Sequence, residues 1–184
     1  MKRTLRIGLV AASITALALV SGPGAQAMGT GNPYDDLQVG VSYQVYEPSF
    51  TAGLSITKGG SNSTCPAGTE ANLSVSYGKP RGTNFTVSEG NPMCWDIGVG
   101  ATVLTTTIQG AQATVVAYCD PASGKPCKKS DVQKFGGHLA MTLPGKGSYR
   151  STTIWIETYG AQHGKKNLTA DQLVKIAQSM APAA

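Results

Sequence analysis

The sequence predicts an α+β domain in which a twisted, mainly antiparallel β-sheet of about eight strands is covered by a C-terminal α-helix. Two observations lead to this prediction. Segments rich in Val, Ile and Thr recur between residues 37 and 159, and in most of them apolar residues alternate with polar or small ones, as in strands with one buried face. After residue 168 the apolar period lengthens to that of a helix. Strands followed by one amphipathic helix favour a helix packed on one face of the sheet.

The N-terminus has the order of a secretory signal peptide. Three bases within the first six residues precede the uncharged run 7–20, and small residues follow it as far as Ala27. The run is shorter than the roughly 20 residues that a membrane-spanning helix needs, so cleavage after Ala27 is expected rather than anchoring. We therefore predict a signal peptide over residues 1–27 and one secreted domain over residues 28–184, with a flexible tail at 28–34.

The mature chain is expected to act outside the cytoplasm, as an extracellular or cell-wall-associated protein without a transmembrane segment. Three of the fifteen Lys and Arg residues lie in the signal peptide, so the mature chain has twelve bases, ten acids and a net charge of +2. Its bases are scattered, apart from the pairs at 128–129 and 165–166, which we interpret as parts of solvated loops. A nucleic-acid partner is not expected, because it needs a dense basic surface.

The four cysteines all lie in the mature part and predict two disulfides, because an even number of cysteines oxidises in pairs outside the cytoplasm. Three pairings are possible. Cys119 and Cys127 bracket a turn-forming segment between two strand-like segments, so we favour this local bond, which leaves Cys65 paired with Cys94. In the loop-entropy model the shorter ring stabilises the domain by about 2–3 kcal/mol and the longer one by about 3–4 kcal/mol. The spacings fit neither a C-x-x-C redox pair nor a zinc site.

The first predicted strand covers residues 37–45, where Leu, Val and Tyr alternate with Gln, Gly and Ser, and Pro48 ends it. A second, shorter alternation at Leu54 and Ile56 precedes an expected loop at residues 59–63. These patterns predict two strands at the start of the domain.

The next four strands form two predicted hairpins. Residues 71–77 and 85–87 alternate on either side of the turn-rich segment 78–82. Residues 103–108 and 111–118 are rich in Val, Thr and Ile and flank a Gln-Gly pair that is typical of a tight turn.

Residues 139–143 and 152–159 predict the last two strands, and the C-terminal helix follows them. Thr169 is the expected N-cap, Gln172 returns a hydrogen bond to it, and the leucines on either side form a hydrophobic staple. Apolar residues then recur at helical spacing as far as Met180 and predict one apolar stripe against the sheet.

Four stretches of the mature chain, residues 45–48, 72–77, 153–156 and 167–177, carry a family resemblance. They resemble small exported domains of unknown function from actinobacterial and related Gram-positive cell envelopes. The closing strand and helix are also similar to the ends of extracytoplasmic domains from sigma-factor regulators and lipoprotein carriers. The resemblance implies a curved sheet with helical cover and a binding or regulatory role. It does not include the cysteines, and it transfers no catalytic residue.

The candidate catalytic residues are few. His138 shares the alternation of Ala140 and Thr142, opposite the apolar face, so we interpret it as a surface residue or as part of a second, wetter cavity. His163 lies in a glycine-containing loop and is interpreted as a surface residue. A small secreted hydrolase would use His138 with Asp96 or a nearby Ser or Thr, but no Gly-x-Ser-x-Gly motif accompanies them.

The two tryptophans are the candidate binding residues, and neither a metal nor a cofactor is expected. Trp95 follows a cysteine predicted to form a disulfide. We therefore favour a Trp95 ring that packs on the sulfur atoms, rather than one that anchors a partner. Trp155 lies between two isoleucines in the last strand, so it faces away from them and covers either the helix side or a ligand groove. The acids at residues 35–36 lack the repeated spacing of a calcium loop.

Export, a disulfide-stapled β-rich core and missing catalytic motifs favour a non-enzymatic binding or regulatory domain, which binds an unknown protein or an apolar ligand at the cell envelope. The alternatives are the small hydrolase and a structural envelope protein without a discrete site. The apolar-ligand hypothesis requires a cavity on the order of several hundred Å³ between sheet and helix.

Overall fold

The computed structural model describes residues 31–64, 70–93, 100–120 and 124–183, so the predicted signal peptide lies outside the described residues. In chain order the elements are α1 (Pro33–Gln38), β1 (Tyr46–Pro48), β2 (Ile56–Thr64), β3 (Ala71–Gly78), β4 (Asn84–Gly90), β5 (Ala101–Ile108), β6 (Ala111–Ala117), α2 (Asp131–Phe135), β7 (Gly137–Leu143), β8 (Thr152–Thr158), α3 (Ala170–Gln178) and β9 (Met180–Pro182).

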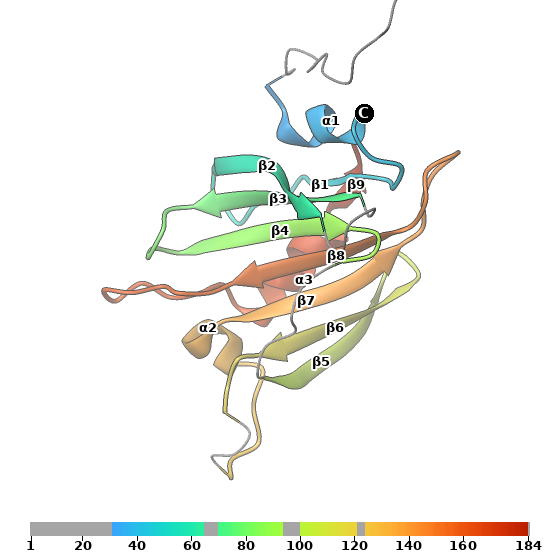
Figure 1. Ribbon diagram of the computed structural model, residues 1–184. Helices are drawn as coiled ribbons and strands as arrows, with labels where there is room; N and C mark the ends of the chain where they lie inside the picture. The colour runs from blue at the N-terminus through green and yellow to red at the C-terminus, as the bar shows by residue number, and fades with distance from the viewer. Residues whose placement is uncertain (1–30, 65–69, 94–99, 121–123, 184) are drawn as a thin grey trace, which may run out of the picture.

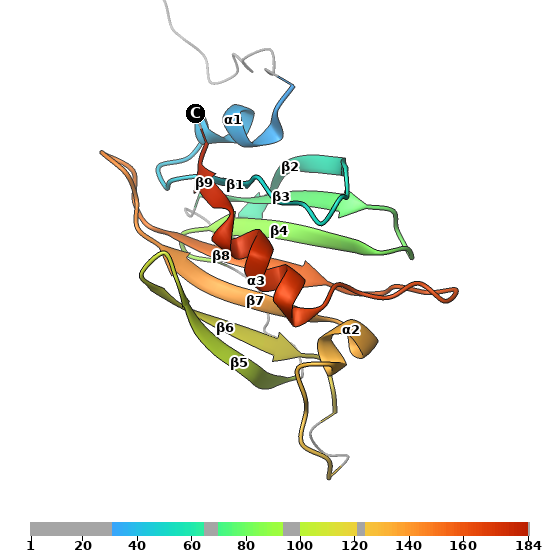
Figure 2. The same cartoon turned by 180° about the vertical axis from the view of Figure 1, so that it is seen from behind.

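Seven strands form one antiparallel sheet in the order β2-β3-β4-β8-β7-β6-β5, and β1 and β9 form a separate antiparallel pair. Figure 1 shows the twisted main sheet, and Figure 2 shows α3 lying over β7 and β8 on one face. The described residues are mostly β with a few helices, which fits the predicted α+β class. The prediction of about eight strands in one sheet matches only roughly, because the main sheet has seven strands and the strand predicted at residues 37–45 is absent.

Both predicted hairpins are present. The pair β3–β4 is joined through residues 79–83, and β5–β6 through Gln109 and Gly110. The two turn residues have φ angles of 50° and 80°, which is the backbone of the tight turns that match the twist of paired strands. Gln109 Nε2 also donates a hydrogen bond of 2.7 Å to the carbonyl oxygen of Met180. This bond ties the hairpin to the C-terminal end of the domain.

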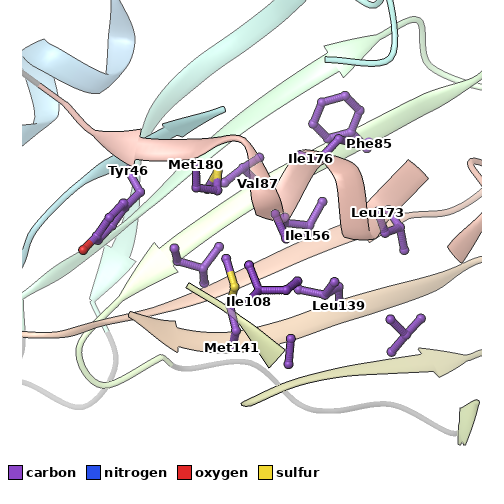
Figure 3. Close-up of a cluster of buried hydrophobic side chains, with 14 of the residues drawn as sticks. Tyr46, Phe85, Val87, Ile108, Leu139, Met141, Ile156, Leu173, Ile176 and Met180 are labelled. Carbon is purple, nitrogen blue, oxygen red and sulfur yellow. The ribbon is translucent and has the colours of Figure 1, made fainter. Parts of the chain in front are cut away.

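The helix α3 begins at the predicted capping box. Gln172 N–H donates to Thr169 Oγ1 at 3.1 Å, and Thr169 N–H donates to Gln172 Oε1 at 2.9 Å, so two orphan donors of the first turn are satisfied. The helix buries its apolar stripe against the sheet. Figure 3 shows this core, whose labelled members include Val87, Leu139, Met141 and Ile156 from the sheet and Leu173 and Ile176 from the helix.

The N-terminal segment differs from the prediction. Residues 37–45 do not form a strand, because α1 covers the start of this range. Asn32 caps α1 by accepting a hydrogen bond of 3.0 Å from Tyr34 N–H, and a proline at the first helical position and two acids in the first turn add to the helix start. These local signals outweigh the alternation. Tyr34 is fully buried, so the predicted flexible tail at 28–34 is wrong at its C-terminal end.

Two glutamines, together with an isolated β-bridge between Tyr43 and Arg150, hold the segment after α1 in place of a regular strand. Gln38 Nε2 donates to the carbonyl oxygen of Tyr43 at 3.0 Å, and Gln38 Oε1 accepts from Val45 N–H at 2.8 Å and from Gln44 Nε2 at 2.8 Å. Both glutamines are buried, although the alternation placed Gln38 and Gln44 on a solvent face. Buried side-chain amides therefore satisfy backbone groups that a strand would have paired.

The loop expected at residues 59–63 is also wrong, because these residues belong to β2 and pair with β3. A Cβ added to Gly59 would lie 2.6 Å from the Cβ of Pro33. The missing side chain lets the start of α1 pack directly on β2. A glycine that permits close packing looks the same in sequence as a glycine in a loop.

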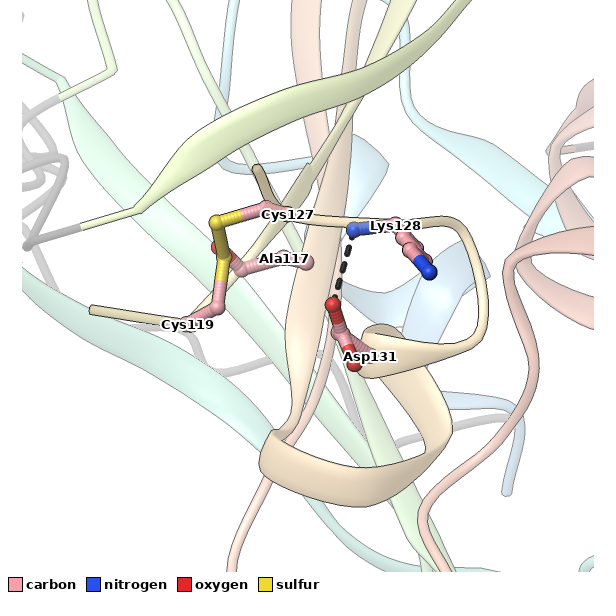
Figure 4. Close-up of a disulfide and its surroundings, with 5 residues drawn as sticks. All are labelled: Ala117, Cys119, Cys127, Lys128 and Asp131. Carbon is pink, nitrogen blue, oxygen red and sulfur yellow. Dashed lines mark hydrogen bonds between the residues drawn. A yellow bond between two sulfur atoms is a disulfide. The ribbon is translucent and has the colours of Figure 1, made fainter. Parts of the chain in front are cut away.

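The predicted disulfide between Cys119 and Cys127 is present, with 6.0 Å between the two Cα atoms. It closes the segment between β6 and α2, shown in Figure 4, where Lys128 N–H donates a 2.7 Å hydrogen bond to Asp131 Oδ2. Cys65 and Cys94 lie outside the described residues. In the described part of the chain, no helix is both long and apolar enough to cross a membrane.

Candidate functional site

The main sheet has two unlike faces. Ile154 and Ile156 belong to the core beneath α3, so Trp155 between them points to the opposite face, which we call the outer face. Trp155 therefore does not lie on the helix side, the first of the two positions that the sequence left open. Besides Trp155, the outer face carries His138, Ala140 and Thr142 of β7, Thr153 and Glu157 of β8, Thr86 and Ser88 of β4, and Ser74 and Ser76 of β3.

His138 belongs to a hydrogen-bonded cluster on the outer face. Its Nδ1 lies 3.1 Å from the hydroxyl oxygen of Tyr118, and that hydroxyl donates a 2.5 Å hydrogen bond to Glu157 Oε1. Because the single hydroxyl proton goes to Glu157, His138 Nδ1 must carry the proton that it shares with Tyr118. The imidazole ring stacks on Trp155 with 3.6 Å between the ring centroids and 17° between the planes.

Burial sets the protonation states of His138 and Tyr118. His138 is 1% exposed, and its desolvation lowers the pKa of the imidazole to about 4. Desolvation, together with the hydrogen bond to Glu157, raises the pKa of the Tyr118 hydroxyl far above its usual value. At neutral pH the imidazole is therefore neutral and the phenol is protonated. His138 is not a surface residue, the first of the two positions predicted for it, because Tyr118, Trp155 and Glu157 enclose it.

This arrangement limits what His138 does chemically. The Glu157 carboxylate is linked to it through the Tyr118 hydroxyl, so a hydrogen-bonded chain joins an acid to the imidazole. The imidazole itself is inaccessible, and Trp155 is 9% exposed, so neither ring offers a contact surface. Asp96 and Trp95 lie outside the described residues, and His163 is exposed in the loop after β8.

The aromatic contacts continue from the buried cluster to the surface. The ring of Tyr118 lies 5.6 Å from that of His138 and 6.0 Å from that of Tyr159, the second contact being edge to face. Tyr159 is 63% exposed. Gly136 leaves room for this contact, since a Cβ there would lie 3.0 Å from Tyr159 Cδ2 and 3.3 Å from Tyr118 Cδ2. A chain of rings thus links buried Trp155 to exposed Tyr159.

Tyr159 begins a loop that is bound to the β3–β4 connection. Gln162 N–H donates to the carbonyl oxygen of Arg81 at 2.9 Å, and Thr83 Oγ1 donates to the carbonyl oxygen of Lys166 at 3.0 Å. Residues 79–83 and 159–167 lie side by side at one end of the sheet in both Figure 1 and Figure 2, and we call this region the hairpin end.

Two cavities flank the hairpin end. One of about 240 Å³ is lined by Arg81, Asn84 and Tyr159 together with Ser76 and Thr86 of the outer face. The other has a volume of about 390 Å³, and its lining includes Lys79, Lys165 and the hydroxyl groups of Ser55, Thr57 and Thr83.

A third described cavity, of about 420 Å³, lies at the opposite end of the sheet and is lined by Gln109, Thr142 and Ser151 among others. It is shallow and has no charged lining residue. Among the residues that the structure describes, no three His, Cys, Asp or Glu side chains gather as a metal site. The hairpin end therefore combines concave surface, charge and an exposed aromatic ring.

Sequence reasoning missed most of this site. His138 lies on β7, Glu157 on the neighbouring β8, and Tyr118 directly follows β6 on the other side of β7. The register that aligns them depends on the strand order. Arg81 and Tyr159 stood in segments recognised as a turn and a strand end. The available signal was that His138 and Glu157 both sit on the polar side of their alternations.

Comparisons with protein-family models, with curated proteins and with solved structures find no match to this chain. The resemblance to exported envelope domains therefore stays an expectation from the sequence.

Proposed function

We propose that the chain is a secreted, non-enzymatic binding domain and that its ligand site is the hairpin end. The observation that carries the proposal is the pair of cavities on either side of two loops that are hydrogen-bonded to each other, with exposed Tyr159 at one rim. Loops that are held in place before binding lose little entropy when a ligand arrives, which favours a preformed site.

Export supports the same role. The signal-peptide pattern and the disulfide between Cys119 and Cys127 fit a domain that works in an oxidising compartment, extracellular or attached to the cell wall. A local disulfide and a solid core suit a small domain that must stay folded outside the cell without chaperones.

The packing beneath α3 argues against an apolar ligand held inside the domain. Leu173 and Ile176 of the helix and Leu139 and Ile156 of the sheet are fully buried against one another, and the described cavities lie at the ends of the sheet. A carrier of an apolar molecule needs a cavity between the helix and the sheet. We therefore place the partner on the surface rather than in the core.

The test is an NMR titration of the mature protein, secreted from the full chain, with fractionated glycans, lipids and peptides of the cell envelope. We expect amide shifts in residues 79–83 and 159–167, and loss of binding in Tyr159→Ser. Tyr149→Ser is the matched control, because Tyr149 is exposed in the connection between β7 and β8. Shifts confined to other regions, or unchanged affinity in Tyr159→Ser, would contradict the proposal.

One observation favours a hydrolase as the second candidate, namely the hydrogen-bonded chain from Glu157 through Tyr118 to His138. This function requires the cluster to become accessible to substrate. Hydrolysis of ester, peptide or glycoside substrates that disappears in His138→Gln but persists in His163→Gln would establish it. Equal turnover by both variants would exclude His138 as the base.

A further inference from the structure

We infer that the hairpin end takes an anionic glycan, a sugar polymer that carries carboxylate or phosphate groups, and this inference rests on the binding role proposed above. The first argument is charge. Lys79 and Arg81 in the β3–β4 connection and Lys165 and Lys166 in the loop after β8 are all exposed. The hydrogen bonds between the two loops bring these four bases to one end of the domain.

One acid, Glu157, lies opposite Thr86 at the edge of this region, and its carboxylate accepts a hydrogen bond from the Tyr118 hydroxyl. The stretches 48–60, 71–88 and 158–170, which supply the walls of both cavities, contain no Asp or Glu. Among the described residues the ion pairs are Lys129 with Asp171 and Arg150 with Glu70, so the four bases of the hairpin end take part in neither. A third of the mature chain's bases thus stand together, although its net charge is small. Such a concentrated positive field attracts an anionic ligand.

The lining of the cavities indicates a sugar rather than a bare anion. Lys79 and Lys165 share their cavity with three hydroxyl side chains. Arg81 shares its cavity with an amide, three Ser or Thr hydroxyls and the ring of Tyr159. A guanidinium group binds a carboxylate or phosphate with two parallel hydrogen bonds. Hydroxyl and amide groups pair with sugar hydroxyls, and an exposed phenol ring packs against the C–H face of a sugar ring.

Other anionic partners fit the site less well. A nucleic acid needs a longer basic stripe with several stacking rings, whereas Tyr159 is the exposed ring in the lining of these two cavities. An anionic membrane is recognised by a convex surface with apolar side chains next to the bases, whereas these bases border concave, hydroxyl-lined cavities.

The experiment is isothermal titration calorimetry of the mature protein with oligogalacturonate, poly(glycerol phosphate) and neutral dextran. We expect binding to at least one of the two anionic polymers, none to dextran, and a clear weakening between about 0.05 M and about 0.3 M NaCl. The variant Arg81→Gln with Lys165→Gln should bind roughly tenfold more weakly or worse. The control Lys125→Gln with Lys146→Gln removes the same charge from exposed sites elsewhere and should bind within about twofold of the parent.

Tyr159→Ser separates a glycan from a simple anion. This substitution should weaken the binding of the anionic polymer but leave the affinity for inorganic pyrophosphate unchanged. Unchanged affinity for the polymer would overturn the glycan inference. Equal or tighter binding to phosphatidylglycerol vesicles would overturn it in favour of a membrane. If a neutral ligand binds in a way that depends on Tyr159, the binding role stands and the anionic glycan is wrong. If neither variant changes the binding of any ligand tested, both the binding role and the glycan inference are wrong.

Discussion

Glu89 places a carboxyl group in the core between the sheet and the N-terminal segment. It lies on β4 next to Leu73 and Ile154, and its Oε2 accepts a 2.9 Å hydrogen bond from Tyr46 N–H. The side chain is fully buried, and in the described part of the chain its Oε1 has no hydrogen-bond partner. Desolvation raises the pKa of this carboxyl well above its usual value.

This burial predicts a pH-dependent stability. The folded state holds a proton on Glu89 that the unfolded state releases above about pH 4.5, so the stabilising contribution is full below that pH and is lost as pH rises through the folded pKa. Glu89→Gln should therefore become more stable relative to the parent as pH rises from about 5 to about 8. Urea unfolding of both proteins at each pH measures the difference, and a difference that is constant with pH would show that Glu89 is ionised in the fold.

The contribution of His138 to stability depends on pH in the opposite direction. Its pKa is depressed from 6.5 to about 4, so its contribution is present above the unfolded pKa and is lost as pH falls toward the folded one. We expect the ring signals of His138 in NMR spectra to stay constant between about pH 8 and pH 5 and to move only below that range. His163→Gln leaves one imidazole in the spectrum and assigns it. A midpoint near 6.5 would mean that the cluster is open to water.

At the scale of elements, α3 is stabilised mainly by its buried stripe. Leu173 is fully buried against the sheet, whereas Lys175 is exposed on the same helix. Leu173→Ala should lower the free energy of unfolding by about 2–5 kcal/mol, because it removes buried carbons and leaves a cavity. Lys175→Ala should change it by no more than about 0.5 kcal/mol. Equal effects in urea unfolding would show that α3 is not packed on the sheet.

The disulfide between Cys119 and Cys127 closes a short ring that joins β6 to α2. Replacing both cysteines with serine should cost about 2–3 kcal/mol, since the unfolded chain regains the freedom that the ring removes. Guanidinium unfolding of the double variant checks the value. Acid cleavage of the Asp120–Pro121 bond inside the ring, followed by mass spectrometry, should find the two flanking peptides still linked in the parent, and separate peptides would contradict the disulfide.

At the scale of the whole molecule, segments near the two ends of the described chain pair with each other. The pair β1–β9 sets Tyr46 beside Pro182 and Pro48 beside Met180, and Ala183 N–H donates to the carbonyl oxygen of Val45 at 2.9 Å. Figure 2 shows the C-terminus next to α1. The N-terminal segment that covers Glu89 is thus secured by residues more than a hundred positions away.

Deleting residues 180–184 should therefore loosen the N-terminal segment as well as the C-terminal one. Loss of buried Met180 and of the β1–β9 pairing should cost about 2–3 kcal/mol or more. Hydrogen exchange at residues 45–49 should accelerate. Met180→Leu, which conserves volume, should stay within about 1.5 kcal/mol. Unchanged exchange in the truncated protein would contradict this coupling.

Features with a local cause were predictable. The β5–β6 turn, the capping box at Thr169 and the bond between Cys119 and Cys127 each depend on residues close together in sequence. The strand expected at 37–45 failed, because an N-cap and buried glutamine hydrogen bonds prevailed over an alternating pattern. The candidate site was predictable only at His138 and Trp155 as single positions. Their environment depends on β8 inserting between β4 and β7.

The sequence by itself determined the polarity of the two sheet faces, the two hairpins, the start of α3 and the disulfide between Cys119 and Cys127. Hydrophobic period, capping and local ring closure each act over a few residues. Tertiary structure alone decided that His138 is enclosed by Tyr118, Glu157 and Trp155, and that two separate basic loops meet beside Tyr159. The reason is physical: the free energy that selects strand order and register comes from burying distant apolar surfaces together, and no short stretch of the chain contains that information.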